Sequence, residues 1–175
     1  MFFSIIAAVD KKYGLGKKRQ LAWDLKADMK HFKDTTLQAE LGKQNAVIMG
    51  STTWESIPER FRPLQGRINV VLSRRKDFSL PDGVILSGSI NDALDSLTGM
   101  GVGLNQVFII GGASVYNEAI NHPLCQKIYL TEIQKDYDCD VFFPHINPKL
   151  FSKINASEFV EEGSVKFRFV EYEKK

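Results

Sequence analysis

Short runs of apolar residues recur along this chain and predict the strands of a β-sheet. The runs at 2–9, 46–49 and 107–110 contain almost no polar residues, which is typical of strands covered on both faces in a parallel sheet. Further strands are expected at 68–72, 84–86 and 127–133. Near the end of the chain Val165, Phe167 and Phe169 alternate with Lys166 and Arg168, after a turn at 162–163. This period of two predicts a terminal antiparallel hairpin.

Between these runs the apolar residues are spaced as in amphipathic helices. Helices are expected at 25–33, with Asp24 as the N-cap, at 51–57, where Pro58 ends the helix, at 90–97 and at 114–120. The segments 10–22 and 35–44 and the glycine-rich linker 99–103 are expected to be loops. This alternation predicts an α/β fold, with helices flanking a mostly parallel central sheet that carries a C-terminal antiparallel hairpin. The length of 175 residues fits a single domain that spans 1–175.

Composition narrows the classes of function. Hydrophobic residues make up 43% of the chain and charged residues 25%, which is ordinary for a globular protein. The 23 basic and 21 acidic residues are interspersed, which argues against a nucleic-acid partner held by one broad positive surface. The apolar run at 2–9 is too short for a signal or membrane helix. Because Cys125 and Cys139 are isolated, the expected compartment is a reducing cytoplasm.

Several catalytic patterns are missing. The histidines His31, His122 and His145 have no metal-ligand spacing, so no metal site is expected. The P-loop pattern of many phosphoryl-transfer enzymes is absent. The stretch 112–116 lies between a strand and a helix like a nucleophile elbow but lacks the second glycine at Tyr116. A serine hydrolase with His145 as the base is therefore only an alternative.

Three predicted strands end in residues suited to phosphate. Gly111 and Gly112 precede a helix whose free N–H groups favour negative charge, and Gly50 precedes a hydroxyl-rich helix start. A basic cluster at 73–76 follows the strand at 68–72. Because ligands of open α/β sheets bind at the carboxyl ends of the strands, a phosphate site is expected there. The alternative for Gly111 and Gly112 is a turn that only permits tight helix packing.

Asp28 places a carboxylate in the apolar stripe of the first predicted helix, beside Leu25 and Phe32. If this stripe is buried, desolvation raises the pKa of Asp28, and an ionised Asp28 needs paired donors from a ligand or a neighbour. The alternative is a first-turn acid that interacts with the helix dipole. The loop at 10–22 is long enough to be a lid or a binding loop, or it is a solvated connector.

Taken in order, these stretches resemble dihydrofolate reductase over nearly the whole chain. The resemblance implies the fold of that family and NADPH-dependent reduction of 7,8-dihydrofolate to 5,6,7,8-tetrahydrofolate, by hydride transfer to C6 and protonation at N5, which supplies one-carbon metabolism. The matching fragments are Ile5-Ile6-Ala7-Ala8, Gly14-Leu15-Gly16, Leu21-Ala22-Trp23, Asp28 to Phe32, residues 47–57, Arg62 to Arg67, Leu72-Ser73, Ile109 to Gly112, Tyr116 and Tyr129 to Thr131. Each fragment is weak alone, but their order and spacing are specific.

On the substrate side, the resemblance assigns Asp28 to the pterin site. Its two oxygens would accept hydrogen bonds from N3 and the 2-amino group, with Thr131 as a further partner. Arg67 would hold the substrate's α-carboxylate. Leu21 and Trp23 would complete the catalytic set, and N5 would take its proton from water admitted under the loop that contains Leu21. The other implied substrate contacts are Ile6, Ala7, Leu25, Phe32, Ile57, Leu64 and Ile110.

On the cofactor side, the resemblance implies NADPH. Ala8 and the loop at 14–22 would meet the nicotinamide, and Ser73 with Arg74 would read the adenosine 2′-phosphate. In this family the peptide between residues 111 and 112 is typically cis. The remaining implied contacts with NADPH are Gly14, Leu15, Leu21, Gly50, Ser51, Thr52, Thr53, Ser56, Leu72, Arg75, Ile110, Gly111, Gly112, Ala113, Ser114, Val115 and Tyr116.

The chain departs from the family pattern at a few positions. Ala22 stands where proline is usual, so a looser lid is expected. Ser51, Thr52 and Ser114 stand where some members have basic residues, which leaves the 2′-phosphate charge mainly to Arg74 and Arg75.

The resemblance also implies a monomer that binds antifolate inhibitors and has no nucleic-acid or membrane partner. Two rival functions stay open, a fold-related reductase of riboflavin synthesis and a nucleotide-binding module without turnover. Asp28, Phe32 and Arg67 argue against the first, because a ribityl phosphate substrate has no need of that acid.

Overall fold

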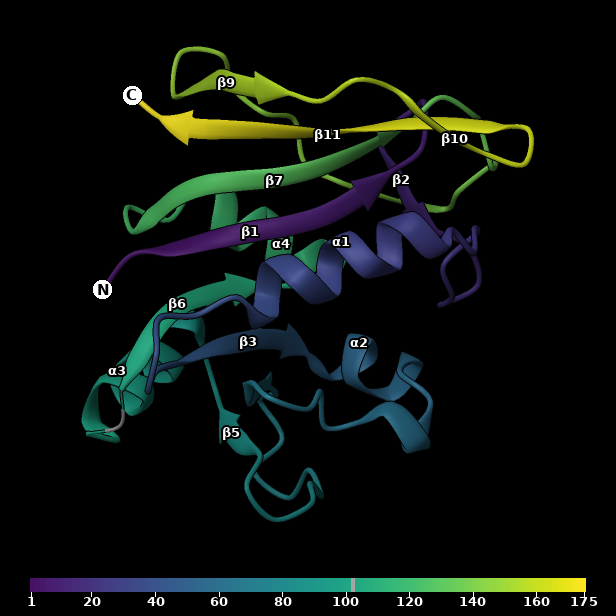
Figure 1. Ribbon diagram of the computed structural model, residues 1–175. Helices are drawn as coiled ribbons and strands as arrows, with labels where there is room; N and C mark the ends of the chain where they lie inside the picture. The colour runs from purple at the N-terminus through teal and green to yellow at the C-terminus, as the bar shows by residue number, and fades with distance from the viewer. Residues whose placement is uncertain (102) are drawn as a thin grey trace.

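The computed structural model describes residues 1–101 and 103–175, and a nine-stranded sheet runs through this part of the chain (Figure 1). Its strands are β1 (Phe3–Val9), β3 (Gln44–Gly50), β4 (Ile68–Leu72), β5 (Ile85–Ser87), β6 (Leu104–Ile109), β7 (Cys125–Ile133), β9 (Phe151–Ala156), β10 (Val160–Glu162) and β11 (Val165–Lys174). The strand order is β10-β11-β7-β1-β6-β3-β4-β5, and β9 pairs with β11 on a branch from this path.

The pairing confirms the predicted fold class. Strands β7, β1, β6, β3, β4 and β5 run parallel to their neighbours in this set. Strand β11 lies antiparallel to β7 and forms the expected C-terminal hairpin with β10. The hairpin thus closes one edge of a mostly parallel sheet.

Alternate residues of the strands face two different helix layers. On β1, Ile5 and Val9 pack in the cluster that contains α3 (Ile90–Gly99) and α4 (Ala113–Ile120), whereas Ile6 packs in a second cluster. The second cluster receives Phe32 from α1 (Lys26–Leu37) and Trp54 from α2 (Ser51–Ser56). In Figure 1, α1 lies in front of the sheet and α4 lies behind β1. The period of two along β1 therefore decides which helix each side chain meets.

Helix α1 differs from its prediction at both ends. It runs from Lys26 to Leu37, so it takes in part of the expected connector 35–44. Its N-cap is Leu25, with no side-chain cap bond, and the predicted cap Asp24 is wrong. Instead, Glu162 of β10 accepts hydrogen bonds from the backbone N–H groups of Lys26 and Ala27. Because Glu162 is so far from Lys26 along the chain, no local sequence pattern could predict this cap.

Two further strand pairings were not expected. The loop at 10–22 contains β2 (Gly14–Gly16), which pairs with β8 (Val141–Phe142) in a two-stranded antiparallel sheet, and β9 pairs along β11. A short 3₁₀ helix, η1 (Glu59–Phe61), follows α2. The predicted linker 99–103 includes Val102, which lies outside the described residues. Among the helices of residues 1–101 and 103–175, none combines the length and apolar character needed to span a membrane.

Candidate active site

The carboxyl ends of β3, β4 and β6 meet at one edge of the sheet. Gly50, at the end of β3, lies in register with Leu72, at the end of β4. The backbone N–H of Gly50 donates to the carbonyl oxygen of Gly111 at 2.8 Å, and that of Ile110 donates to Ile48 at 2.9 Å. The glycine turns and the basic cluster, which are far apart in the sequence, therefore share one edge as expected.

Gly111 lies where neither its backbone conformation nor the available space suits a side chain. Its φ angle is 131°, and its peptide bond to Gly112 is cis, as the resemblance to dihydrofolate reductase implied. A Cβ atom at Gly111 would lie 3.1 Å from Thr53 Oγ1 and 3.4 Å from the Tyr116 hydroxyl. Tight packing is thus one reason for this glycine. Helix α4 then starts with Gly112 as an N-cap that forms no side-chain cap bond, so the first N–H groups of α4 are not occupied by a capping side chain.

Tyr116 fixes the start of α4 to the central strand β1. Its hydroxyl donates to the carbonyl oxygen of Ile6 at 2.8 Å, and the residue is buried. Burial, with the nearby charge of Asp28, raises the pKa of Tyr116, so the phenol stays protonated. Because this proton is already donated to Ile6, the hydroxyl is a structural donor here.

Asp28 is buried, and its carboxylate faces the sheet. It lies in the first turn of α1, as the dipole alternative requires, but its side chain is bonded to the protein rather than solvated. Thr131 Oγ1 of β7 donates to Asp28 Oδ1 at 2.8 Å. Burial raises the pKa of Asp28, the hydrogen bond from Thr131 opposes this effect, and the negative charge of Glu162 adds to it.

Apolar side chains from β1, α1, α2 and the segments around them gather on the same face of the sheet as Asp28. One buried cluster contains Trp54 and receives Ile6, Phe32, Ile57, Leu64 and Ile110 from the predicted substrate contacts. A second cluster contains Trp23 and Leu25, with Ala8 packed against it. Ala7 differs, because its side chain packs with α3 and α4 on the opposite face. Only the backbone of Ala7 can face this side.

Trp23 and Leu21 lie close in sequence but in different environments. Trp23 is 7% exposed, and its indole Nε1 has no hydrogen-bond partner among the described residues. Leu21 is 60% exposed. Trp23 therefore has a buried donor without a partner among the described residues, whereas the apolar side chain of Leu21 is in solvent.

Arg67 is half-buried at the far end of α1. Its Nη1 donates to Thr36 Oγ1 at 2.9 Å, and its Nε donates to the carbonyl oxygen of Gln65 at 3.0 Å. Burial lowers the pKa of Arg67. Its Nη2 has no hydrogen bond within the described residues, so this nitrogen of the guanidinium is available as a donor.

The basic cluster after β4 is open to solvent. Arg74 is exposed and forms no ion pair within residues 1–101 and 103–175, whereas Arg75 Nε lies 3.6 Å from Asp77 Oδ1. Ser73 Oγ accepts a hydrogen bond from the backbone N–H of Arg75 at 3.1 Å. Thr52, Ser56 and Ser114 are exposed, and Ser51 and Thr53 are half-buried. Leu15, Leu72 and Val115 pack with the α3 and α4 cluster, so the structure does not gather all the predicted cofactor contacts on one surface.

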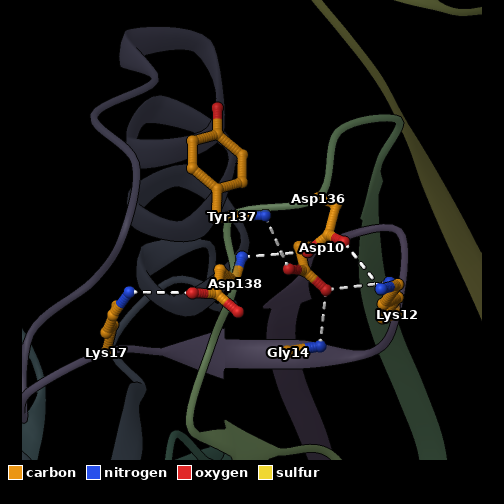
Figure 2. Close-up of polar contacts among 7 residues, drawn as sticks. All are labelled: Asp10, Lys12, Gly14, Lys17, Asp136, Tyr137 and Asp138. Carbon is orange, nitrogen blue, oxygen red and sulfur yellow. Dashed lines mark hydrogen bonds and ion pairs between the residues drawn. The ribbon is translucent and has the colours of Figure 1, made fainter.

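The loop at 10–22 is anchored by the buried carboxylate of Asp10 (Figure 2). Asp10 Oδ1 accepts hydrogen bonds from the backbone N–H groups of Lys12 at 2.9 Å and Gly14 at 2.7 Å. Asp10 Oδ2 accepts one from the N–H of Tyr137 at 3.0 Å. Although burial opposes ionisation, these backbone donors lower the pKa of Asp10. A side chain at Gly14 would overlap Cys139, so the two loops are in close contact. The loop is therefore not a free connector.

A family model described as dihydrofolate reductase matches residues 2–174. The chain belongs to the dihydrofolate reductase family. Members of this family are oxidoreductases that reduce dihydrofolate to tetrahydrofolate with NADPH. The dihydrofolate reductase of Heliothis virescens is 38% identical over 179 residues, which cover 98% of this chain and 96% of that protein. The solved structure of Schistosoma mansoni dihydrofolate reductase matches with a TM-score of 0.86 and 37% identity, covering 99% of this chain and 98% of that one.

Plant relatives carry the same region within a longer protein. Bifunctional dihydrofolate reductase-thymidylate synthase 2 of Arabidopsis thaliana is 40% identical over 172 residues. The match covers 95% of this chain but 30% of that relative, and a second Arabidopsis relative is covered over 34% of its length. The chain therefore spans about a third of the length of the bifunctional relatives that it matches.

Several residues that shape this reductase-family site carried no signal in the sequence. The carboxylates of Asp10 and Glu162 accept hydrogen bonds from backbone N–H groups more than 120 residues away, and such bonds leave no local pattern in the sequence. Arg62 lay within a matching fragment, but its role did not show in the sequence: its Nη1 donates to the carbonyl oxygens of Trp54 at 2.8 Å and Ile57 at 3.0 Å. The absence of a metal stays a prediction, and in the described part of the chain no three His, Cys, Asp or Glu side chains form a group that could hold a metal ion.

Asp28→Asn is expected to change how the stability of the ligand-free protein depends on pH. The pKa of Asp28 is higher in the folded state than in the unfolded state, so ionisation makes the parent less stable as pH rises between these two pKa values. The variant cannot ionise, and it should gain stability relative to the parent as pH rises from about 4 towards neutrality. Urea unfolding at several pH values measures this difference. Asp34→Asn, at an exposed position on the same helix, is the control, and identical pH profiles for the parent and Asp28→Asn would contradict the account.

Asp10→Asn is expected to lower the free energy of unfolding by about 2 kcal/mol at neutral pH, because an amide replaces a charged acceptor of three N–H groups. The pKa of Asp10 is lower in the folded state than in the unfolded state, so its stabilisation is present above about pH 4 and is lost as pH falls through the folded pKa. The difference in urea unfolding between parent and variant should therefore shrink in acid. Asp136→Asn in the facing loop is the control, and a difference that stays constant or grows in acid would show that the charge of Asp10 is not responsible.

Proposed function

We propose that this chain catalyses the NADPH-dependent reduction of 7,8-dihydrofolate to 5,6,7,8-tetrahydrofolate. The observation that supports this most is the buried pair formed by Asp28 and Thr131 beside an apolar wall. A carboxylate in such a place needs a ligand with paired donors, and a flat heterocycle with adjacent N–H groups meets that need. Membership of the dihydrofolate reductase family points to the same substrate.

On the substrate side, Asp28 orients the pterin ring. Its carboxylate accepts hydrogen bonds from N3 and the 2-amino group, and the hydroxyl of Thr131 supports it from β7. Leu25, Phe32, Ile57 and Leu64 enclose the rings of the substrate, with Ile6 and Ile110 at the base. Arg67 binds the α-carboxylate through Nη2, the guanidinium nitrogen that Thr36 and Gln65 do not use.

The residues on the cofactor side fit a dinucleotide that carries phosphates. The start of α4 has no side-chain cap, and Gly111 leaves no side chain between the strand end and a ligand. Ser73 and Arg74 lie at the end of β4, where they would hold a 2′-phosphate, with Arg75 beside them. NADPH, when bound, supplies the hydride that reduces C6 of the substrate.

The protein residues position the substrate and control access of water. Asp28 fixes and polarises the pterin, and N5 receives its proton from water rather than from Asp28 itself. The exposed Leu21 lies on the loop that admits this water, and Asp10 anchors the base of that loop. The buried Nε1 of Trp23 is a free donor for a polar group of the ligand or for an ordered water.

The proposal also covers the domain organisation, oligomeric state, compartment and inhibitors of the enzyme. Residues 1–175 act as one reductase domain, the protein is a monomer in the cytoplasm, and antifolates compete for the site of Asp28. The family match across residues 2–174 and the two free cysteines support these points.

The parent protein should oxidise NADPH when dihydrofolate is added, measured as loss of absorbance by the reduced nicotinamide. Asp28→Asn should lower kcat/KM roughly 10²-fold near neutral pH, because the pterin loses its charged acceptor. Asp34→Asn, on the solvent side of α1, should behave like the parent. An Asp28→Asn variant as fast as the parent would remove the role proposed for this carboxylate.

Arg74→Ala should raise KM for NADPH about tenfold or more, because it removes a charge-assisted contact with the 2′-phosphate. KM for NADH should change less than about twofold, since NADH lacks that phosphate. Lys76→Ala removes the same charge from the same exposed cluster and is the matched control. Equal effects of Arg74→Ala on both cofactors would contradict this account of selectivity.

A further inference from the structure

The N-terminus of α1 is capped by a carboxylate from the opposite end of the chain. Glu162 Oε2 accepts a hydrogen bond from the N–H of Lys26 at 2.8 Å, and Glu162 Oε1 accepts one from the N–H of Ala27 at 3.0 Å. The helix has no cap of its own, because Leu25 occupies the N-cap position. Two N–H groups that the helix leaves unsatisfied are thus bound by one side chain.

The capped turn is the turn that carries Asp28. Asp28 follows Ala27 directly, and its carboxylate is held from the other side by Thr131 of β7. Strand β7 pairs with β11, where Phe169 lies opposite Thr131, and β11 pairs with β10, where Val165 lies opposite Glu162. These contacts connect four elements in a ring. Glu162 of β10 binds α1, Asp28 of α1 binds β7, and β7 pairs with β11, which pairs with β10. A shift of this turn would therefore break a hydrogen bond, either from its backbone N–H groups to Glu162 or from Thr131 to Asp28.

The charge of Glu162 also acts on this turn. A carboxylate at a helix N-terminus is favoured by the helix dipole, and the N–H groups of Ala27 and Lys26 lower the pKa of Glu162, so it is ionised near neutral pH. Three groups from other elements interact with Asp28: the hydroxyl of Thr131 from β7 donates to it, the protonated phenol of Tyr116 from α4 is affected by its charge but donates to Ile6, and the charge of Glu162 from β10 raises its pKa. Of these, only Glu162 carries a charge, and the cationic group beside Glu162 itself is Lys26.

We propose that Glu162 is a positioning residue for the reductase reaction, which holds the first turn of α1 so that Asp28 meets the pterin in a fixed orientation. This inference rests on the function proposed above. It assigns Glu162 to the substrate side alone, because within residues 1–101 and 103–175 the hydrogen bonds of its carboxylate are to α1, whereas the proposed cofactor contacts lie at the start of α4 and after β4. It also gives Glu162 a second effect, since its negative charge favours the protonated form of Asp28.

The test compares Glu162→Gln, Glu162→Ala and Glu161→Gln in the full chain. Glu162→Gln keeps the size of the side chain but loses the charge and one of the two acceptor oxygens, and Glu162→Ala loses both acceptors. Glu161 is the adjacent acid, exposed and in register with Lys166, so Glu161→Gln makes the same change of charge away from α1. Steady-state kinetics with dihydrofolate and NADPH, pH profiles of kcat/KM and urea unfolding are measured for each variant.

We expect Glu162→Gln to lower kcat/KM for dihydrofolate about tenfold while KM for NADPH stays within about twofold of the parent. The ionisation that Asp28→Asn removes from the pH profile should move to lower pH, because a negative charge near Asp28 is gone. Glu162→Ala should lose at least as much activity, and Glu161→Gln should match the parent in both readouts.

Two results would overturn the inference. One is a Glu162→Gln variant with the kinetics and pH profile of the parent. The other is a variant whose stability falls while both substrates are affected equally and the ionisation does not move, which is the outcome for a purely structural cap. If Glu162→Ala does not fold, Glu162→Gln alone decides. A parent protein that fails to oxidise NADPH with dihydrofolate would instead overturn the proposed function, so the two failures are distinguishable.

Discussion

The hydrogen bond from Thr131 to Asp28 connects the helix on one face of the sheet to strand β7 beneath it. A buried carboxylate is costly unless its oxygens have partners, and Thr131 provides one partner for one oxygen. The other oxygen accepts no hydrogen bond within the described residues, and the apolar wall of Ile6, Phe32 and Ile57 lies on the same face of the sheet. Much of the remaining architecture can be understood as support for this pair, because each neighbouring element restrains either α1 or β7.

Helix α1 is restrained at both ends by groups from other elements. Glu162 binds its first turn, and at its other end the guanidinium of Arg67 donates to Thr36. The side chain of Asn45, in β3, donates to the carbonyl oxygens of Thr36 and Gln38 at 2.9 Å each. Because these bonds satisfy groups that a helix end leaves free, they fix the position of α1 over the sheet as well as its length. The helix propensity of its sequence contributes less to this placement than the groups around it do.

On the proposed cofactor side, backbone groups rather than side chains shape the site. Parallel strands bring Gly50 and Gly111 to one edge, and the absence of side chains there leaves room for a ligand near the helix start. Tyr116 ties that edge to β1 through Ile6, so the two sides of the proposed site share a common strand. The loop at 10–22 completes the arrangement, since Asp10 holds its base to Tyr137 and leaves Leu21 exposed at its far end.

The amino-acid sequence by itself determined the parallel strands, the terminal hairpin, the two faces of the sheet and the apolar stripe that contains Asp28, but not β2, β8 or β9. These features depend on residues two to four positions apart, and their period is visible in the chain. No local pattern showed that Asp28 pairs with Thr131, which the family resemblance implied, and only the tertiary structure decided that Glu162 rather than Asp24 caps α1 and that Asp10 anchors the loop through Tyr137. Each of these contacts joins residues more than 100 positions apart. Such contacts exist only once the strand order β10-β11-β7-β1 has brought distant segments together, and no local pattern records that order.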